Sequence, residues 1–228
     1  MTEKLSIQAY QAIKNDIVFC RLTPGKQVTQ SQLIEQYMYG IVPIREALQR
    51  LAQENLVQAI PRSGYLITNI TVSDIHEIYD LRLPFEITAA KLAVERGRDE
   101  HLQALLLKAS FTYQFEKSQG YEIFLKKNHA FHVSIAEASG NQRLVSLISR
   151  MMDDLTRVLF LGLGVKDRGE EMQAEHLELA QALSERNKEA AVEAVRLQIE
   201  HSKQTTLDSL ANPHSNYYAD TKYDQLKL

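Results

Sequence analysis

Residues 43–51, PIREALQRL, and residues 54–68, ENLVQAIPRSGYLIT, decide the fold of the N-terminal part of this chain. The apolar residues of the first stretch recur at helical spacing: Ile44, Ala47, Leu48 and Leu51. Pro43 falls in the first turn of this helix, where its missing N–H removes no helical bond. The second stretch has two apolar runs on either side of Pro61-Arg62-Ser63-Gly64, a pattern that predicts a β-hairpin with a tight basic tip.

Two further helices are predicted upstream of these stretches. Tyr10, Ile13 and Ile17 share one helical face, and the pattern stops at the turn formed by residues 22–25, LTPG. A second helix begins at Thr29, which has the capping-box spacing to Gln32, and residues 38–42 form a short link around Gly40. Two short helices joined by such a link and followed by a hairpin predict a winged helix-turn-helix.

Composition and charge divide the chain in the same place. Residues 1–70 hold seven Lys/Arg against five Asp/Glu, a net charge of +2, whereas the remainder holds nineteen against twenty-four, a net charge of −5. A single cysteine, Cys20, makes no internal disulfide, and no apolar run approaches the roughly 20 residues of a membrane helix. We therefore expect a cytoplasmic protein that does not enter a membrane.

From Thr71 onward every segment has a helical pattern. The first helix is expected over 71–97, capped by Thr71 and Asp74 and kinked at Pro84, and the second over 99–120, capped by Asp99. Four more are expected over 121–138, 141–161, 170–186 and 188–210. The fold class is therefore mainly α: a winged helix-turn-helix (α+β) over 1–70, an all-α six-helix bundle over 71–211, and a loose tail over 212–228 whose three tyrosines are candidates to dock on a partner subunit.

Several short motifs resemble a known family. In the N-terminal part these are LTPG at 22–25, PIREAL at 43–48, ENLV at 54–57 and RSGY at 62–65. In the remainder they are DLR at 80–82 with Glu86, FH at 131–132, ASGN at 138–141 and EH at 175–176. Together, in this order over residues 5–210, they resemble GntR-family transcriptional regulators of the FadR-like branch, whose helical effector domain is called FCD.

The resemblance implies that the third helix of the N-terminal domain contacts base edges in DNA. Arg45 lies off the buried stripe and is the best candidate for a bidentate contact with guanine, and Arg50 lies about 140° further around the helix. Arg62 and Gly64 in the wing would meet phosphate or the minor groove, with Gly64 allowing a close backbone approach. The alternative for Arg45 is a salt bridge to Glu46 or another nearby acid.

This sequence departs from the family where the third helix begins. Members commonly have Ser-Arg-Thr before the proline, whereas this chain has Gly40, Ile41 and Val42. Glycine is acceptable at a helix N-cap, but Ile41 and Val42 lack the hydrogen-bond donors of the residues they replace. We expect either weaker DNA binding or a preference that shifts toward apolar contact with a thymine methyl.

Polar side chains from three helices are predicted to meet in the core of the bundle. Asn128 and His132 are four residues apart on an apolar helical face, and His176 lies among the apolar residues of another helix. Gln198 follows Ala191 and Val195 on the last helix. Buried polar groups need partners, so this convergence indicates a cavity for a ligand or a metal.

In many FCD domains the corresponding residues are one Asp and three His, which bind a divalent transition metal. Here amides replace two of them, at Asn128 and Gln198, and the two imidazoles that remain, His132 and His176, make a poor metal site. His201 lies one turn beyond Gln198 and is a possible substitute. Three interpretations stay open: a direct organic-ligand pocket, a metal held by His132 and His176 with help from the amides, and core histidines that are merely satisfied.

The resemblance also implies a small effector, often a carboxylate. Arg82 on the first bundle helix is one candidate to bind it, and Arg157 is a second. The alternative for either arginine is a structural ion pair with Glu86 or Asp153. We therefore predict a ligand-responsive transcription regulator that binds a palindromic operator as a homodimer and is not an enzyme. The alternative is a metal-dependent helical-bundle enzyme, which would need an open metal position and a general base.

Overall fold

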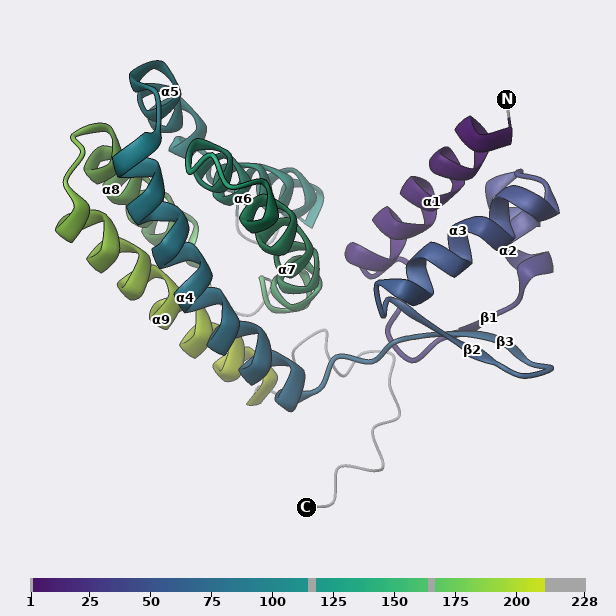
Figure 1. Cartoon of the computed structure of the whole chain (residues 1–228). Helices are drawn as coiled ribbons and strands as arrows, with labels where there is room; N and C mark the ends of the chain where they lie inside the picture. Colours follow the sequence, from purple (N-terminus) through teal and green to yellow (C-terminus); the bar gives the residue numbers. More distant parts are fainter. Residues whose placement is uncertain (1, 115–117, 164–166, 212–228) are drawn as a thin grey trace. The chain divides into compact units, whose positions relative to one another are not determined.

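The chain folds into two units, one ending at Thr71 and the other beginning at Val72 (Figure 1). The structure is a computed structural model that describes residues 2–114, 118–163 and 167–211. Each unit has its own core. The predicted tail over 212–228, with its tyrosines, lies outside the described residues. No helix within the described ranges is long and apolar enough to cross a membrane.

The first unit contains three helices and a small antiparallel sheet in the strand order β1-β3-β2. The elements are α1 (Thr2–Val18), β1 (Gln27–Val28), α2 (Gln30–Tyr37), α3 (Ile41–Gln53), β2 (Val57–Ile60) and β3 (Gly64–Ile67). The hairpin of β2 and β3 is the predicted wing. Strand β1 was not predicted, because two residues are too few to show an alternating pattern; it pairs with β3 through Gln27 opposite Leu66.

Helices α1 and α3 form the centre of the first core. Ile13 and Ile17 of α1 and Leu48 of α3 are fully buried. The predicted capping box is present: Thr29 accepts a hydrogen bond from the Gln32 amide, and the Gln32 side chain accepts one from the Thr29 amide. The predicted link, however, is two residues too long. Helix α3 begins at Ile41, because Gly40 has the extended backbone of an N-cap.

Over the residues that the structure describes, the second unit is an all-helical bundle of six helices, as predicted. These are α4 (Val72–Arg96), α5 (Asp99–Ala109), α6 (Ser118–Ala138), α7 (Gln142–Gly162), α8 (Gly169–Ser184) and α9 (Lys188–Ala211). The long helices α4 and α9 run side by side, and α8 packs against both α5 and α9 (Figure 1). This packing directs residues of α4, α6, α8 and α9 into one core.

Two helix predictions in this unit are wrong in detail. Helix α5 ends at Ala109 and not near Gly120, because Phe111 and Tyr113 are buried on one side of an extended segment while Thr112 is exposed. This alternation is a period-2 pattern, which a helix cannot bury. The N-cap of α5 is Arg98, and Asp99 is the first helical residue. Pro84 lies inside α4, which continues through it.

Candidate functional site

One face of helix α3 is exposed and carries the predicted DNA-reading residues. Ile41, Arg45 and Gln49 follow one another at intervals of four residues and are all exposed, whereas Ile44 and Leu48 are buried on the opposite side. Arg45 forms no ion pair with any described residue, so the predicted alternative of a salt bridge to Glu46 is not seen. Its guanidinium is therefore available to a partner.

The helix begins with residues that offer no side-chain hydrogen bonds. Gly40 is the N-cap, with φ −69° and ψ 169°, and makes no side-chain cap bond. Ile41 is 62% exposed and Val42 is 37% exposed. Arg50, in the last turn of α3, is also exposed. The exposed surface of α3 is thus apolar at its N-terminal end and carries the positive charges of Arg45 and Arg50 toward its C-terminal end.

The wing presents Arg62 at its tip. Arg62 is exposed and has a positive φ of 64°, and the neighbouring Ser63 carbonyl accepts a hydrogen bond of 2.6 Å from Gln27 Nε2. Gly64 has a φ of 106°, and a Cβ there would lie 2.4 Å from the Val28 carbonyl oxygen. The close backbone approach at Gly64 is therefore made to strand β1 inside the domain.

In the second unit, a buried chain of charges links α4 to α6. Arg82 Nε donates a 2.6 Å hydrogen bond to Glu86 Oε1, and Glu86 Oε2 lies 2.8 Å from His132 Nδ1. All three side chains are almost completely buried. Burial raises the pKa of Glu86, but the charges of Arg82 and His132 outweigh that effect and lower the pKa to about 2. Glu86 is therefore a carboxylate that lies within ion-pair distance of both Arg82 and His132.

A second pair joins α6 to α8 beside this chain. His176 Nε2 lies 2.9 Å from Asn128 Oδ1, and His176 Nδ1 lies against the Met172 carbonyl oxygen. Burial, followed by the nearby charge of His132, lowers the pKa of His176 to about 3, so the ring is neutral and holds one proton. Both ring nitrogens face acceptor oxygens, whereas a neutral ring has one N–H; with that proton on Nδ1, the Asn128 amide donates to Nε2 only if its oxygen and nitrogen are exchanged.

Three of the four predicted cavity residues therefore come together. The rings of His132 and His176 are 5.5 Å apart between centroids, and Asn128 contacts His176. Gln198 is buried on α9, but its Oε1 has no hydrogen-bond partner among the described residues, and neither does His132 Nε2. His201 does not substitute for Gln198, because it is exposed and its Nδ1 bonds to Glu175 Oε1 at 2.8 Å.

Arg82 also contacts α9. Its Nη1 donates a 3.2 Å hydrogen bond to Ser202 Oγ, and its guanidinium lies 5.7 Å from the centre of the Tyr79 ring. The Tyr79 hydroxyl in turn bonds to Ser202 and to Thr206. The predicted alternative partner of Arg82, Glu86, is thus its ion-pair partner in this structure. Arg157 is buried on α7.

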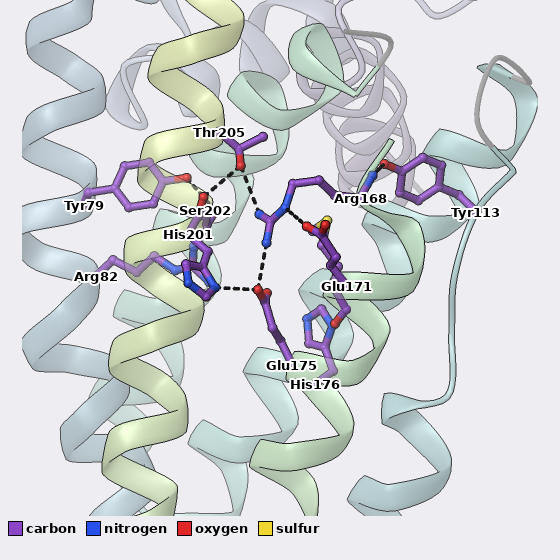
Figure 2. Close-up of polar contacts among 11 residues, drawn as sticks. Tyr79, Arg82, Tyr113, Arg168, Glu171, Glu175, His176, His201, Ser202 and Thr205 are labelled. Carbon is purple, nitrogen blue, oxygen red and sulfur yellow. Dashed lines mark hydrogen bonds and ion pairs between the residues drawn. The ribbon is translucent and has the colours of Figure 1, made fainter. Parts of the chain in front are cut away.

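A second polar cluster, next to Ser202, surrounds Arg168 (Figure 2). Arg168 donates to Glu171, to Glu175 and to Thr205, and its backbone N–H donates to the Tyr113 hydroxyl. A small cavity of about 20 Å³ lies here, about the space that one water molecule needs. Because two carboxylates neutralise Arg168, the cavity does not attract an anion.

The residues of this core do not fit a tightly bound transition metal. One of the two imidazoles, His176, already uses both ring nitrogens, on Met172 and on Asn128. Amide oxygens at Asn128 and Gln198 are weak replacements for an anionic ligand and an imidazole. Within the described ranges there is no group of three or more His, Cys, Asp or Glu side chains placed to hold a metal ion.

The structure adds residues that the sequence analysis did not place in the cavity. Glu86 bridges Arg82 and His132, and Ser202 accepts a hydrogen bond from Arg82 and lines the small cavity beside Arg168. The spacing of four residues between Arg82 and Glu86 is a sequence signal for an ion pair. The polar residues Ser202, Thr206 and Ser209 share one face of α9, a second signal that could have been recognised.

Comparisons with known proteins agree with this architecture. Residues 5–67 match the family described as bacterial regulatory proteins, gntR family, and residues 77–201 match the FCD domain. The HTH-type transcriptional regulator YdhC of Bacillus subtilis is 28% identical over 197 residues, 86% of this chain and 88% of the relative. The HTH-type transcriptional repressor GlaR of Escherichia coli is 30% identical over 162 residues, 69% of this chain and 74% of the relative.

The fold has also been seen in solved structures. Escherichia coli McbR/YncC superimposes with a TM-score of 0.74 at 22% identity, covering 90% of this chain and 98% of the other. The relatives are transcriptional regulators, which confirms the prediction of a regulator and removes the alternative of a metal-dependent enzyme. The chain therefore belongs to the GntR family of bacterial transcriptional regulators, with an N-terminal helix-turn-helix that binds DNA and a C-terminal FCD domain.

Proposed function

We propose that this regulator binds a palindromic operator as a homodimer, and that a small carboxylate effector binding in the FCD domain changes its affinity for DNA. Two copies of α3 are needed to read two half-sites, so a two-fold dimer matches a palindrome. On each copy, Arg45 contacts guanine, Arg50 and Arg62 contact the backbone, and Gly40 places the start of α3 in the groove. The exposed, unpaired Arg45 is the observation that supports this DNA contact.

The proposed effector site is the buried polar core between α4, α6, α8 and α9. It is supported by two buried atoms that lack partners among the described residues, His132 Nε2 and Gln198 Oε1. Such atoms are costly unless a ligand or water satisfies them. The effector presents a carboxylate toward Arg82 and a hydrogen-bond donor toward Gln198. It binds directly, without a metal, and Asn128, His176 and Arg157 complete the surroundings.

The coupling to DNA runs through α4. The carboxylate competes with Glu86 for Arg82 and so loosens the contact between Glu86 on α4 and His132 on α6. Because α4 begins at Val72, directly after the DNA-binding unit, a change in its packing alters the populations of DNA-binding conformations. The effector changes the affinity for DNA only to the extent that it binds one of these conformations more tightly than the others.

Selection of genomic DNA fragments by the purified full-length protein tests the proposal, repeated with a set of small carboxylates. The expected result is enrichment of fragments with a palindromic site, release or tightening by a subset of the carboxylates, and a dimer by light scattering. The matched variant is the double change Arg82→Met, Glu86→Gln, which leaves no unpaired buried carboxylate. It should select the same fragments and lose the response to the carboxylate. Absence of any enriched site contradicts DNA regulation, whereas enrichment without any carboxylate response contradicts the effector assignment.

A further inference from the structure

The start of helix α3 carries an apolar patch on the surface assigned above to DNA. Ile41 and Val42 are 62% and 37% exposed, and Met38, just before the helix, is 85% exposed. The Ile41 and Val42 side chains can neither donate nor accept hydrogen bonds. Phosphate binding therefore does not explain them, and their exposure means that they add little to the core.

The patch is in register with the arginine that contacts DNA. Ile41, Arg45 and Gln49 form one exposed row along α3, each one turn of helix after the last. Four residues advance about 6 Å along a helix axis, and base pairs in DNA are about 3.4 Å apart. A helix lying along the major groove therefore brings Ile41 to a base pair about two steps from the one that Arg45 contacts.

The major groove offers only one apolar group on a base edge, the C5 methyl of thymine. We propose that Ile41, supported by Val42, determines operator specificity by contacting a thymine methyl about two base pairs from the guanine contacted by Arg45. The inference rests on the proposed contact between α3 and DNA. One row of side chains on α3 thus reads two base pairs, one through the apolar contact of Ile41 and one through the charged contact of Arg45.

A protein partner is the other class of occupant for an apolar patch. The charges around this patch favour DNA, since Arg45 and Arg50 are exposed and Arg45 has no ion pair with a described residue. The domain that carries them has a net charge of +2, opposite in sign to that of the remainder. We therefore assign the patch to the nucleic acid.

The test isolates the methyl group itself. Duplexes are first selected from a randomised library with the full-length protein, and the guanine lost from the preference of Arg45→Ala identifies the register. At the thymine about two base pairs from that guanine, four duplexes are then compared that carry thymine, uracil, cytosine or 5-methylcytosine. Removing the methyl from thymine should weaken binding by about fourfold per half-site, the effect of one buried methyl. Adding it to cytosine should strengthen binding by a similar factor.

Two variants assign the methyl effect to a residue. In Ile41→Ala, thymine and uracil duplexes should bind with nearly equal affinity, because the side chain no longer reaches the methyl. Ile7→Ala is the matched control, since Ile7 is an isoleucine of the same domain, is 43% exposed on α1, and lies outside the row on α3. Ile7→Ala should keep the full fourfold difference.

The outcomes separate this inference from the function on which it rests. Equal binding of thymine and uracil duplexes by the unaltered protein overturns the inference but leaves DNA regulation intact. A methyl effect that persists in Ile41→Ala also overturns it, because another residue must then make the contact. If no duplex is enriched at all, the proposed DNA contact fails and the inference fails with it.

Discussion

His176 Nε2 lies 2.9 Å from Asn128 Oδ1, so an amide on α6 faces the ring nitrogen of α8 that a metal would otherwise bind. The opposite nitrogen, Nδ1, is directed at the Met172 carbonyl, an orientation typical of metal-binding histidines. With its oxygen and nitrogen exchanged, the Asn128 amide donates a hydrogen to the neutral ring, which a carboxylate at position 128 could not do. The pair is satisfied without an ion.

We therefore expect protein purified without added metal to contain well below one equivalent of zinc, nickel or manganese. The double change Asn128→Asp, Gln198→His should raise metal affinity sharply, because it supplies an anion and a third imidazole beside His132 and His176. Elemental analysis of both proteins measures this. Stoichiometric metal in the unaltered protein would contradict the expectation, and no gain in the double variant would show that the four positions do not converge.

The burial of His176 predicts a pH-dependent stability. Its pKa is about 3 in the folded protein against an ordinary value of 6.5, so between these values the unfolded chain binds a proton that the folded chain does not. The free energy of unfolding should fall as the pH is lowered through this window, by up to about 1.4 kcal/mol per pH unit. Glu86, with a folded pKa of about 2 against 4.5, adds its own loss only below about pH 4.5.

Urea denaturation between pH 4.5 and 6.5 therefore measures mainly the contribution of His176. The control is His176→Asn, which removes the titrating ring and keeps an N–H donor for the Met172 carbonyl. The pH slope of this variant should be smaller across the window. An unchanged slope would mean that His176 is not the group responsible.

The Arg82–Glu86 pair predicts a large effect of removing one partner. Arg82→Met leaves the Glu86 carboxylate buried with only His132 beside it, and should lower the free energy of unfolding by about 3 to 5 kcal/mol. The double change Arg82→Met, Glu86→Gln removes the unpaired charge while an amide oxygen still faces His132 Nδ1. It should recover at least half of the loss in urea denaturation. A double variant no more stable than the single one would disprove the charge argument.

Two glycines in the DNA-binding unit should respond differently to substitution. Gly64→Ala should destabilise the unit by about 2 kcal/mol or more, since its φ is 106° and the new Cβ would meet the Val28 carbonyl. Gly40→Ser is the control: it adds an N-cap hydroxyl at an extended backbone and should stabilise by a few tenths of a kcal/mol. Thermal unfolding of both variants checks this, and a neutral Gly64→Ala would contradict the close approach to β1.

Arg45 and Arg62, two of the three arginines of the proposed DNA surface, should affect DNA binding in different ways when substituted. Arg45→Ala should cost roughly 1 to 3 kcal/mol of binding and relax the preference at one base pair. Arg62→Ala should weaken binding evenly across sequences and lower the salt dependence, because the contact proposed for the wing is with phosphate. Binding measured at several salt concentrations with matched and mismatched duplexes distinguishes them. If Arg45→Ala changed neither affinity nor preference, α3 would not be the reading helix.

Sequence alone determined the elements whose signals are local. The capping box of Thr29 and Gln32 and the hairpin between residues 57 and 67 depend on residues a few positions apart, so both could be predicted. The exposed position of Arg45 followed from helical spacing. The same spacing placed Asn128 and His132 on one buried face.

Only the tertiary structure decided which side chains meet across elements. Glu86 on α4 contacts His132 on α6, a residue 46 positions later in the sequence. His176 lies within hydrogen-bond distance of Asn128 and not of Gln198. Strand β1 exists because β3 pairs with it, and Gly64 is required because that pairing brings Val28 close. Periodicity fixes the face on which a residue lies within its own helix or strand. The distance between two such faces is set by how helices and strands pack, which no local pattern in the sequence encodes.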